Sequence, residues 1–251
     1  MSRTRQRLTV EQEPFLVVRS FACTYPTGFV IDEHRHDWDQ LLYASAGSMT
    51  VQARRATWLI PPGKAVFLPA EWEHGIRMWG DVAMRSLAFP RGIAAGECRV
   101  LSVTPLLREL ILRVVEMAAL DSRVTAHQHL LGVLLGEMGQ SAVVPLELPM
   151  PRDERALAVA RWLVTTPDED AGLDLLARRF GAGRRTLERL FRNETGMSFG
   201  LWRQKARMLE SVRLLAEGKS VTEAALGTGY ASVSAFIAAF KQTFGCTPGR
   251  M

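Results

Sequence analysis

The feature that most constrains this chain is an internal repeat in its last hundred residues. The segment LARRFGAGRRTLERLFRNETGMS reappears as AALGTGYASVSAFIAAFKQTFGCT. Leu187 and Phe191 recur as Phe236 and Phe240, at an offset of 49 residues. Each copy reads as a short helix, a turn that contains glycine, and a second helix with apolar residues four positions apart. This duplication predicts two small helical motifs of the same kind.

The turn of each copy has the same chemistry. Ala177 and Gly181 recur as Ala225 and Gly229, at an offset of 48 residues. The small alanine lets two helices approach closely, and the glycine four residues later can end the first helix in a left-handed conformation. The pattern predicts two helix-turn-helix motifs, and in such motifs the second helix enters the major groove of DNA.

The first predicted recognition helix, from about residue 183 to 194, has a basic outward face. Its apolar side consists of Leu187, Leu190 and Phe191. The outward side chains are Arg184, Arg185, Glu188, Arg189 and Arg192. Arginine pairs with guanine edges and with phosphates, so we expect this helix to make most of the direct base contacts. The alternative interpretation is a basic face that is merely solvated.

The second predicted recognition helix, from about residue 232 to 244, has few hydrogen-bonding groups. Its expected DNA-facing residues are Ser232, Val233, Ser234 and Ile237. They suit contacts with thymine methyl groups and phosphates, so this helix mainly positions the domain. Between the copies we expect a helix of about 17 residues, which would let both motifs reach successive major grooves about 34 Å apart.

The charge distribution agrees with a nucleic-acid-binding C-terminal half. From Arg152 onward there are 16 basic and 11 acidic residues, which accounts for the whole net charge of +5. The rest of the chain is neutral. By itself such an asymmetry is weak evidence, because many solvated helical faces are basic.

The N-terminal part, from about residue 14 to 90, reads as short strands separated by turns, which predicts a β-sandwich or barrel. His34, His36, Trp38 and Gln40 follow one another at a spacing of two. On an unbroken strand these side chains point the same way, and Asp37 and Asp39 point to the opposite face. The spacing predicts a wall of two imidazoles, an indole and a carboxamide.

Two helices are predicted after the strands. TPLLRELILRVVEMAAL has Thr104 as a cap and Pro105 at the first helical position, and DSRVTAHQHLLGVLLGEM begins with Asp121 or Ser122 as a cap. Their apolar faces either complete the core of the barrel or form a dimer interface. SAVVPLELPMPRD, with three prolines, reads as a linker.

With these residues identified, the last hundred residues resemble the DNA-binding domain of AraC/XylS-family transcription regulators. The segment GYASVSAFIAAFKQTFGCTPGR carries the resemblance, which covers residues 155–250. It implies a double helix-turn-helix domain that binds operator DNA, a homodimer, and RNA polymerase as a candidate partner. One departure is Ala238, where the family often has an arginine.

The N-terminal half is similar to the cupin-type sensor domain of many such regulators. His34, His36, Gln40 and Gly47 fit its first motif, and LPAEWEH ends in His74. The resemblance implies an effector pocket formed by His34, His36, Trp38, Gln40 and His74. His34, His36 and His74 are also candidate ligands of Zn²⁺ or another first-row ion, although Gln40 occupies the usual carboxylate position. Hydrogen-bonded core histidines are the third interpretation.

Taken together, the sequence predicts an α+β protein with a cupin-like barrel (1–100), a helical bridge for dimerisation with a linker (101–151), and a double helix-turn-helix domain (152–251). We expect a transcription regulator that responds to a small-molecule effector, with an efflux or catabolic gene as a candidate target. The alternative is a metal-dependent cupin enzyme with an appended DNA-binding domain.

The rest of the sequence narrows the class of protein. No catalytic residues are predicted, since we find no nucleophile–base pair, phosphate loop or carboxylate dyad. The polar N-terminus and the lack of a long apolar run indicate neither a signal peptide nor a membrane span. Cys23, Cys98 and Cys246 are scattered, which fits a reducing cytoplasm.

Overall fold

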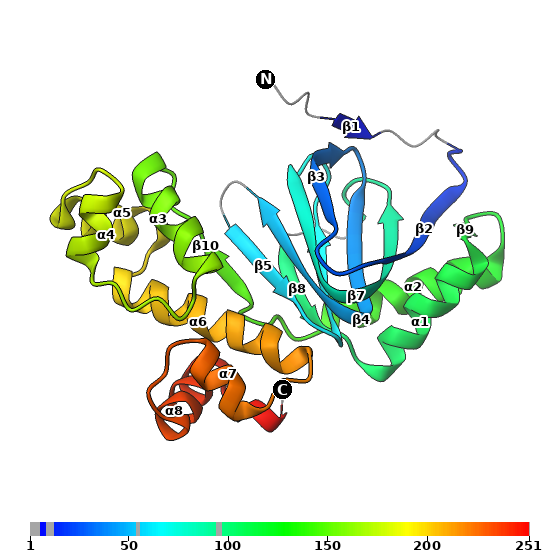
Figure 1. Cartoon of the computed structure of the whole chain (residues 1–251). Coiled ribbons are helices and arrows are strands. Elements are labelled where there is room, and N and C mark those ends of the chain that lie inside the picture. The colour runs from blue at the N-terminus through cyan, green and yellow to red at the C-terminus, as the bar shows by residue number, and fades with distance from the viewer. Residues whose placement is uncertain (1–5, 9–12, 54–55, 94–96, 251) are drawn as a thin grey trace. The chain divides into compact units, whose positions relative to one another are not determined.

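The computed structural model describes residues 6–8, 13–53, 56–93 and 97–250 (Figure 1). It confirms the predicted mixture of an N-terminal β-structure and a helical C-terminal part. The chain divides into two compact units. The first contains the described residues up to Ala53 and from Trp58 to Glu147, and the second contains Ala56, Thr57 and the residues from Leu148 onward. Among the helices of the described residues, none has the length and apolar character needed to cross a membrane.

The strands of the first unit are arranged around the long strand β7. The bounds of the strands are β1 (Gln6–Leu8), β2 (Leu16–Tyr25), β3 (Val30–His36), β4 (Asp39–Ala53), β5 (Ala56–Ile60), β6 (Lys64–Leu68), β7 (His74–Phe89), β8 (Arg99–Ser102), β9 (Ala119–Asp121) and β10 (Glu147–Pro149). On one side β7 pairs antiparallel with β4, from Asp39 opposite Phe89 to Ala53 opposite His74. On its other side β7 pairs with β2 and with β3. Strand β6 joins β4 to β8.

The two central strands are longer than the short strands expected from the sequence. Strand β4 has 15 residues and β7 has 16, and their pairing is irregular around Ala44, Ala46 and Ser48. Irregular pairing bends a strand and increases its twist, so one long strand can serve where two short ones were expected. Gly47 lies at this bend with φ of 69°, a left-handed conformation that favours glycine.

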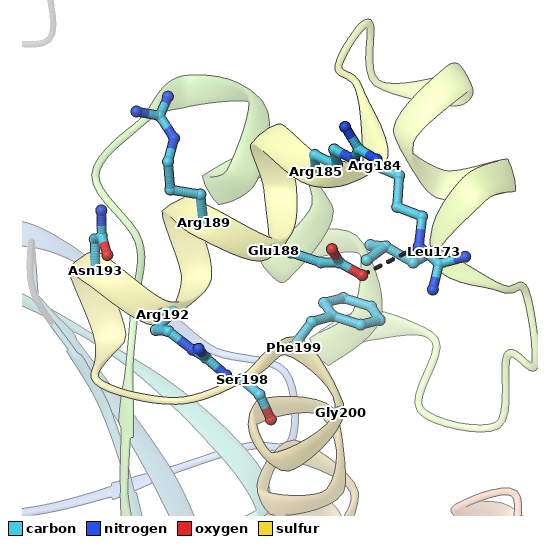
Figure 2. Close-up of a pocket in the computed structure, with 10 residues that line it drawn as sticks. All are labelled: Leu173, Arg184, Arg185, Glu188, Arg189, Arg192, Asn193, Ser198, Phe199 and Gly200. Atoms are coloured by element: carbon cyan, nitrogen blue, oxygen red, sulfur yellow. Dashed lines mark hydrogen bonds and ion pairs between the residues drawn. The ribbon is translucent and has the colours of Figure 1, made fainter.

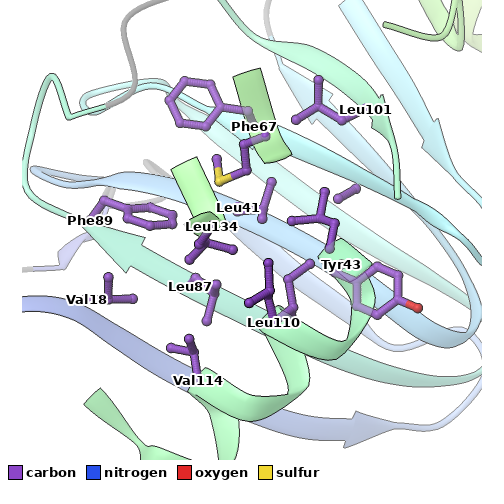
Figure 3. Packing of buried hydrophobic residues seen from close by; sticks show 14 of the residues in the cluster. Val18, Leu41, Tyr43, Phe67, Leu87, Phe89, Leu101, Leu110, Val114 and Leu134 are labelled. Carbon is purple, nitrogen blue, oxygen red and sulfur yellow. The ribbon is translucent and has the colours of Figure 1, made fainter. Parts of the chain in front are cut away.

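Helix α1 (Pro105–Met117) covers one face of the sheet. Thr104 caps it as predicted, since its Oγ1 accepts a hydrogen bond from Leu107 N at 3.1 Å. Leu110 and Val114 are buried against Leu41 and Leu87 of the sheet (Figure 3). Of the two alternatives for this helix, its apolar face therefore completes the core.

Helix α2 (Thr125–Gln140) begins later than the sequence indicated. Residues 119–121 form strand β9, which pairs with β2, so neither Asp121 nor Ser122 is the cap. The residue before the helix is Val124, which makes no side-chain cap. Leu134 and Met138 are buried in the same core as α1, whereas Val133 on another side of α2 is 49% exposed.

The second unit consists mainly of helices and confirms the predicted repeat. Its helices are α3 (Glu154–Thr165), α4 (Leu173–Arg179), α5 (Arg184–Thr195), α6 (Phe199–Ala216), α7 (Val221–Gly227), α8 (Val233–Phe244) and the 3-10 turn η1 (Pro248–Arg250). Gly181 and Gly229 have φ of 66° and 75°, so both turns use a left-handed glycine as predicted. Helix α6 has 18 residues and connects the two copies.

The segment predicted as a linker is held at both ends. Ser102 N donates to Ala142 O and Val144 N donates to Val100 O, both at 2.9 Å, so its start pairs with strand β8. Near its end, the indole N–H of Trp202 in α6 donates to Pro149 O at 2.6 Å. Each end is therefore fixed to the compact unit nearest to it.

The bend at Gly47 supports a prediction about stability. A methyl group at Gly47 would lie 2.5 Å from Asp81 O and 2.9 Å from Val82 Cα. Gly47→Ala should therefore lower the free energy of unfolding by about 3 kcal/mol, through backbone strain and this contact together. The control is Gly80→Ala, where φ is 71° but the nearest atom is 3.9 Å away, with an expected loss of about 1 kcal/mol. Equal losses in denaturant titrations would contradict this.

Candidate nucleic-acid interface and histidine cluster

Helix α5 presents the basic face that the sequence predicted. Leu187 and Phe191 are fully buried, and Phe191 packs edge-to-face on Phe199 and Trp202 of α6. This burial fixes the rotation of α5 about its axis. The side chains on the opposite face are exposed, and they are Arg184, Arg185, Glu188, Arg189 and Arg192. All five residues proposed from the sequence are therefore accessible.

The arginines on this face differ in their partners. Arg184 donates to Asp174 at 2.9 Å and to Glu188 at 3.1 Å. These carboxylates raise the pKa of Arg184, the hydrogen bond to Glu188 being the larger cause. In the part of the chain that the structure describes, Arg185, Arg189 and Arg192 form no ion pair. Their guanidinium groups are available to a ligand.

A hollow of about 680 Å³ lies beside this face, between α5 and the start of α6 (Figure 2). Arg189 and Arg192 line it together with Asn193 and Ser198, which the sequence analysis did not single out. Ser198 caps α6, since its Oγ accepts from Leu201 N. A hollow that combines arginines, an amide and a helix N-terminus suits an anionic oxygen such as a backbone phosphate.

Helix α8 presents a weaker polar face, as the sequence indicated. Ser232 and Ser234 are exposed, and Val233 and Ile237 are half-buried. Ser232 is also the cap of the helix, because its Oγ accepts from Ala235 N at 3.2 Å. Its hydroxyl hydrogen can still be donated outward. The four predicted residues thus lie together at the start of α8.

The histidine motif of the first unit is not one unbroken strand. Strand β3 ends at His36, residues 37–38 form a bend, and β4 begins at Asp39. The prediction for Asp37 and Asp39 assumed an unbroken strand, and this assumption is wrong. Asp39 is buried and accepts from Ala70 N at 2.9 Å and from Gly92 N at 2.8 Å, which fixes the bend.

The three predicted histidines lie together despite this break. His74 at the start of β7 is opposite His34 of β3, and their ring centroids are 4.5 Å apart. The ring of His36 lies 5.2 Å from that of His74. Trp38 stacks on His36 with a centroid distance of 4.5 Å and an angle of 7°. The structure thus brings His34, His36, Trp38 and His74 into one cluster.

Backbone carbonyls orient all three imidazoles. The Nδ1 atom of His34 lies 2.9 Å from Asp32 O, that of His36 lies 2.8 Å from Trp38 O, and that of His74 lies 2.7 Å from Trp72 O. A carbonyl oxygen only accepts, so each Nδ1 carries the hydrogen and each neutral ring has its lone pair on Nε2. The cluster therefore presents three acceptor nitrogens.

Gln40 satisfies one of these acceptors. As placed, its Oε1 lies 2.9 Å from His36 Nε2 and its Nε2 donates to Ser86 Oγ at 2.8 Å. A half-turn of the amide exchanges these two atoms without moving the rest of the side chain. Because Nε2 of His36 has the lone pair, the amide NH₂ group is best directed to His36 and its oxygen to the Ser86 hydroxyl. In this arrangement Gln40 acts as a hydrogen-bond partner of His36 in the wall of the site.

Burial keeps His74 neutral. It lowers the pKa of His74 to about 3, and it also lowers the pKa of His36. Among the described residues, His74 Nε2 is buried without a hydrogen-bond partner, and so are the indole nitrogens of Trp38 and Trp58. Buried polar atoms are seldom left unpaired, so these groups call for a ligand or water.

The three histidines also offer ligands for a metal ion. His34, His36 and His74 each offer a ligand nitrogen, and these atoms lie within 4.8 Å of one another. Three neutral imidazoles oriented through Nδ1 are a suitable ligand set for Zn²⁺. Binding through His36 would require Gln40 to release Nε2. The cluster can therefore hold a metal only after this hydrogen bond is broken.

Comparison with known proteins agrees with both halves of this description. Residues 176–251 match a family model described as a helix-turn-helix domain, and residues 18–148 match one described as an AraC-like ligand binding domain. The chain is 32% identical to the HTH-type transcriptional regulator NimR of Escherichia coli K12 over 219 residues, which cover 86% of this chain and 80% of that protein.

Two further similarities are more limited. The HTH-type transcriptional regulator RipA of Corynebacterium glutamicum is 37% identical over 100 residues, or 40% of this chain and 30% of that protein. Among solved structures, the fatty-acid-bound ToxT of Vibrio cholerae is 13% identical, with a TM-score of 0.40 over 96% of each chain. The ligand-binding model spans more than half of the sequence and NimR is similar over most of it, so the chain belongs to the AraC family of transcription regulators.

Proposed function

We propose that this DNA-binding regulator reads its operator mainly through α5, with α8 as the supporting contact. The observation that carries this proposal is the row of exposed guanidinium groups of Arg185, Arg189 and Arg192, which form no ion pair with the described residues and lie opposite a buried apolar side. Arg185 and Arg189 suit guanine edges, and Arg192 beside the hollow suits phosphate. Ser232, Val233, Ser234 and Ile237 would contact phosphates and thymine methyl groups.

Arg184 and Glu188 have a different part in this proposal. Their ion pair, extended to Asp174, holds both side chains on the same face as the free arginines. Exposed ion pairs of this kind are weak, so the arrangement can open when a phosphate replaces a carboxylate. Glu188 then remains to accept from a cytosine amino group or to orient a neighbouring arginine.

The effector site of the proposal is the histidine cluster of the first unit. The support is its two groups that have no hydrogen-bond partner among the described residues: an acceptor nitrogen on His74 and a donor N–H group on Trp38. A compact, uncharged ligand that both donates and accepts hydrogen bonds would satisfy them, with Gln40 and His36 in the wall. Effector binding regulates transcription only if it favours one state of the protein over another.

A second candidate ligand is a first-row metal ion such as Zn²⁺, held by His34, His36 and His74. The observation in its favour is the convergence of three neutral imidazole nitrogens within 4.8 Å. The hydrogen bond between Gln40 and His36 disfavours it, because this bond uses the lone pair that the metal would need. Both candidates are ligands of a sensor. NimR, similar over most of the chain, is a transcription regulator, and we propose that this protein is a regulator without catalytic activity.

We also propose that the regulator is a homodimer through the outer face of α2. Gly132, Val133 and Gly136 lie on this face, and beyond the helix's own backbone no described atom lies within 4 Å of a methyl group placed at either glycine. Glycine inside a helix is destabilising by about 1 kcal/mol relative to alanine, and small residues allow a second helix to approach. Two copies could then bind paired half-sites in the cytoplasm, with RNA polymerase as a further partner.

Mapping the genomic sites that the purified protein binds would identify the target genes beside those sites. We expect efflux or catabolic genes among them. The strongest site then serves as the operator probe in the measurements below.

The first prediction concerns base contacts. Arg185→Ala and Arg189→Ala should each weaken operator binding by about 1–3 kcal/mol, or roughly 5- to 150-fold, with an unchanged melting temperature. Arg161→Ala on α3 removes one exposed charge from the same unit and is the matched control. Fluorescence anisotropy at a fixed salt concentration gives the affinities. If both α5 variants bind as tightly as the control, the groove assignment is rejected.

The second prediction distinguishes the two ligands of the sensor. Gln40→Glu supplies a carboxylate beside His36 and should increase Zn²⁺ affinity about 10- to 100-fold over the wild type. His74→Gln in the same background should remove the increase. Calorimetric titration of chelator-treated protein measures both. Wild-type protein that retains one Zn²⁺ per chain after dialysis against a chelator would make the metal the principal candidate.

The third prediction concerns the dimer. Val133→Glu places a charge on the proposed interface and should convert a dimer to a monomer in sedimentation velocity experiments, since a charge buried without a partner is strongly unfavourable. Val143→Glu, at a position that is 62% exposed outside the helices, is the control and should leave the dimer intact. A wild-type protein that is monomeric at micromolar concentration would reject this interface.

A further inference from the structure

Arg207 occupies a central place in the second unit. It lies near the middle of α6, the helix that joins the two helix-turn-helix motifs, and its side chain is only 17% exposed. Its Nε donates to Pro167 O at 3.0 Å and its Nη2 donates to Glu169 O at 2.9 Å. Both carbonyls belong to the segment between α3 and α4. Arg207 therefore holds the chain that leads into the first motif.

Arg203, one turn earlier on α6, contributes to the same contact. Its Nη1 donates to Ala171 O at 2.9 Å, and its Nη2 donates to Glu169 O, the carbonyl shared with Arg207. Carbonyl groups of a loop are satisfied in this way without regular secondary structure. The two guanidinium groups thus tie the entry of α4 to α6.

The Arg207 guanidinium also lies close to the second motif. Gly229, in the turn between α7 and α8, has φ of 75°. A methyl group at Gly229 would lie 2.8 Å from Arg207 Nη2, 3.1 Å from Arg207 Cζ and 3.3 Å from Asp168 O. Gly181 occupies the equivalent turn of the first motif, and no described atom lies within 4 Å of a methyl group there. The close approach is thus a property of the second turn.

We propose that Arg207 is a positioning residue that couples the two motifs and sets α5 and α8 at one relative placement. Its guanidinium binds the segment that leads into α4 and abuts the turn that leads into α8. The inference rests on the proposed function, in which both motifs bind one duplex. When α5 and α8 have a fixed relative placement, binding of one motif to DNA brings the other motif to its site on the same duplex. Coupling through Arg207 therefore raises affinity only for DNA that engages both motifs.

The chemistry of the contact requires arginine. The planar guanidinium donates along one edge to two carbonyls while its flat surface lies against the glycine backbone. A lysine ammonium is a compact point charge on a flexible stem and cannot make both contacts in the same plane. Arg207→Lys keeps the charge on α6 and changes the geometry, which separates positioning from net charge.

The test compares two DNA probes with the full chain. One probe is a duplex selected from a random 24-base-pair library by the wild-type protein, and the other probe is a shortened duplex that lacks the half contacted by α8. Arg207→Ala and Arg207→Lys should weaken binding to the full probe about tenfold or more, and binding to the shortened probe by less than about twofold. A residue that only stabilises the fold would weaken both equally.

A second pair of variants leaves Arg207 in place. Gly229→Ala introduces the close contact and should reduce affinity for the full probe as Arg207→Ala does. Gly218→Ala is the matched control, because Gly218 has φ of 85° with no described atom within 4 Å of the added methyl group, so it shares only the backbone strain. This pair decides the question if Arg207→Ala fails to fold.

Two results would overturn the inference. The first is that Gly229→Ala binds the full probe as tightly as Gly218→Ala does. The second is that folded Arg207 variants lose the same factor of affinity on both probes. A failure of the proposed function looks different, because the wild-type chain would then select no duplex, or Arg185→Ala and Arg189→Ala would bind the full probe normally.

Discussion

The burial of one apolar stripe on each recognition helix is the constraint on which the DNA-binding half depends. Leu187 and Phe191 in α5 are four residues apart, as are Phe236 and Phe240 in α8, and all four are fully buried. Each contributes about 2 kcal/mol when removed from water. Rotation of α5 about its axis would expose this surface, so the burial of two side chains determines that Arg185 and Arg189 face outward.

Helix α6 joins the two helix-turn-helix motifs into one packed unit. Trp202 on α6 packs on Phe191 and donates its N–H to Pro149 O. Further along the same helix, Arg207 binds the segment before α4 and touches the turn before α8. Helix α6 therefore acts as the common scaffold of both motifs. A count of basic residues alone would assign Arg203 and Arg207 of this helix to DNA binding, whereas both donate hydrogen bonds to backbone carbonyls of the same unit.

In the sensor unit, hydrogen bonds to the backbone fix the orientation of the histidine side chains. Its histidines are useful to a ligand because carbonyls of Asp32, Trp38 and Trp72 hold every Nδ1 hydrogen. All Nε2 lone pairs are then left on the other side of the rings, in a site where burial keeps His74 uncharged. The hydrogen bond from Gln40 to His36 sets the balance between a hydrogen-bonding ligand and a metal ion.

The sequence by itself determined the repeat, the left-handed turns at Gly181 and Gly229, and the outward face of α5, because the pattern of each motif lies within one short segment of the chain. Strand β9 in place of a cap at Asp121 and the break after His36 depended on pairing with distant strands, which local propensity cannot anticipate. The resemblance to cupin-type domains grouped His74 with His34, but tertiary structure decided that their rings lie 4.5 Å apart and that Arg207 meets Gly229, because only packing brings residues so far apart in sequence into contact.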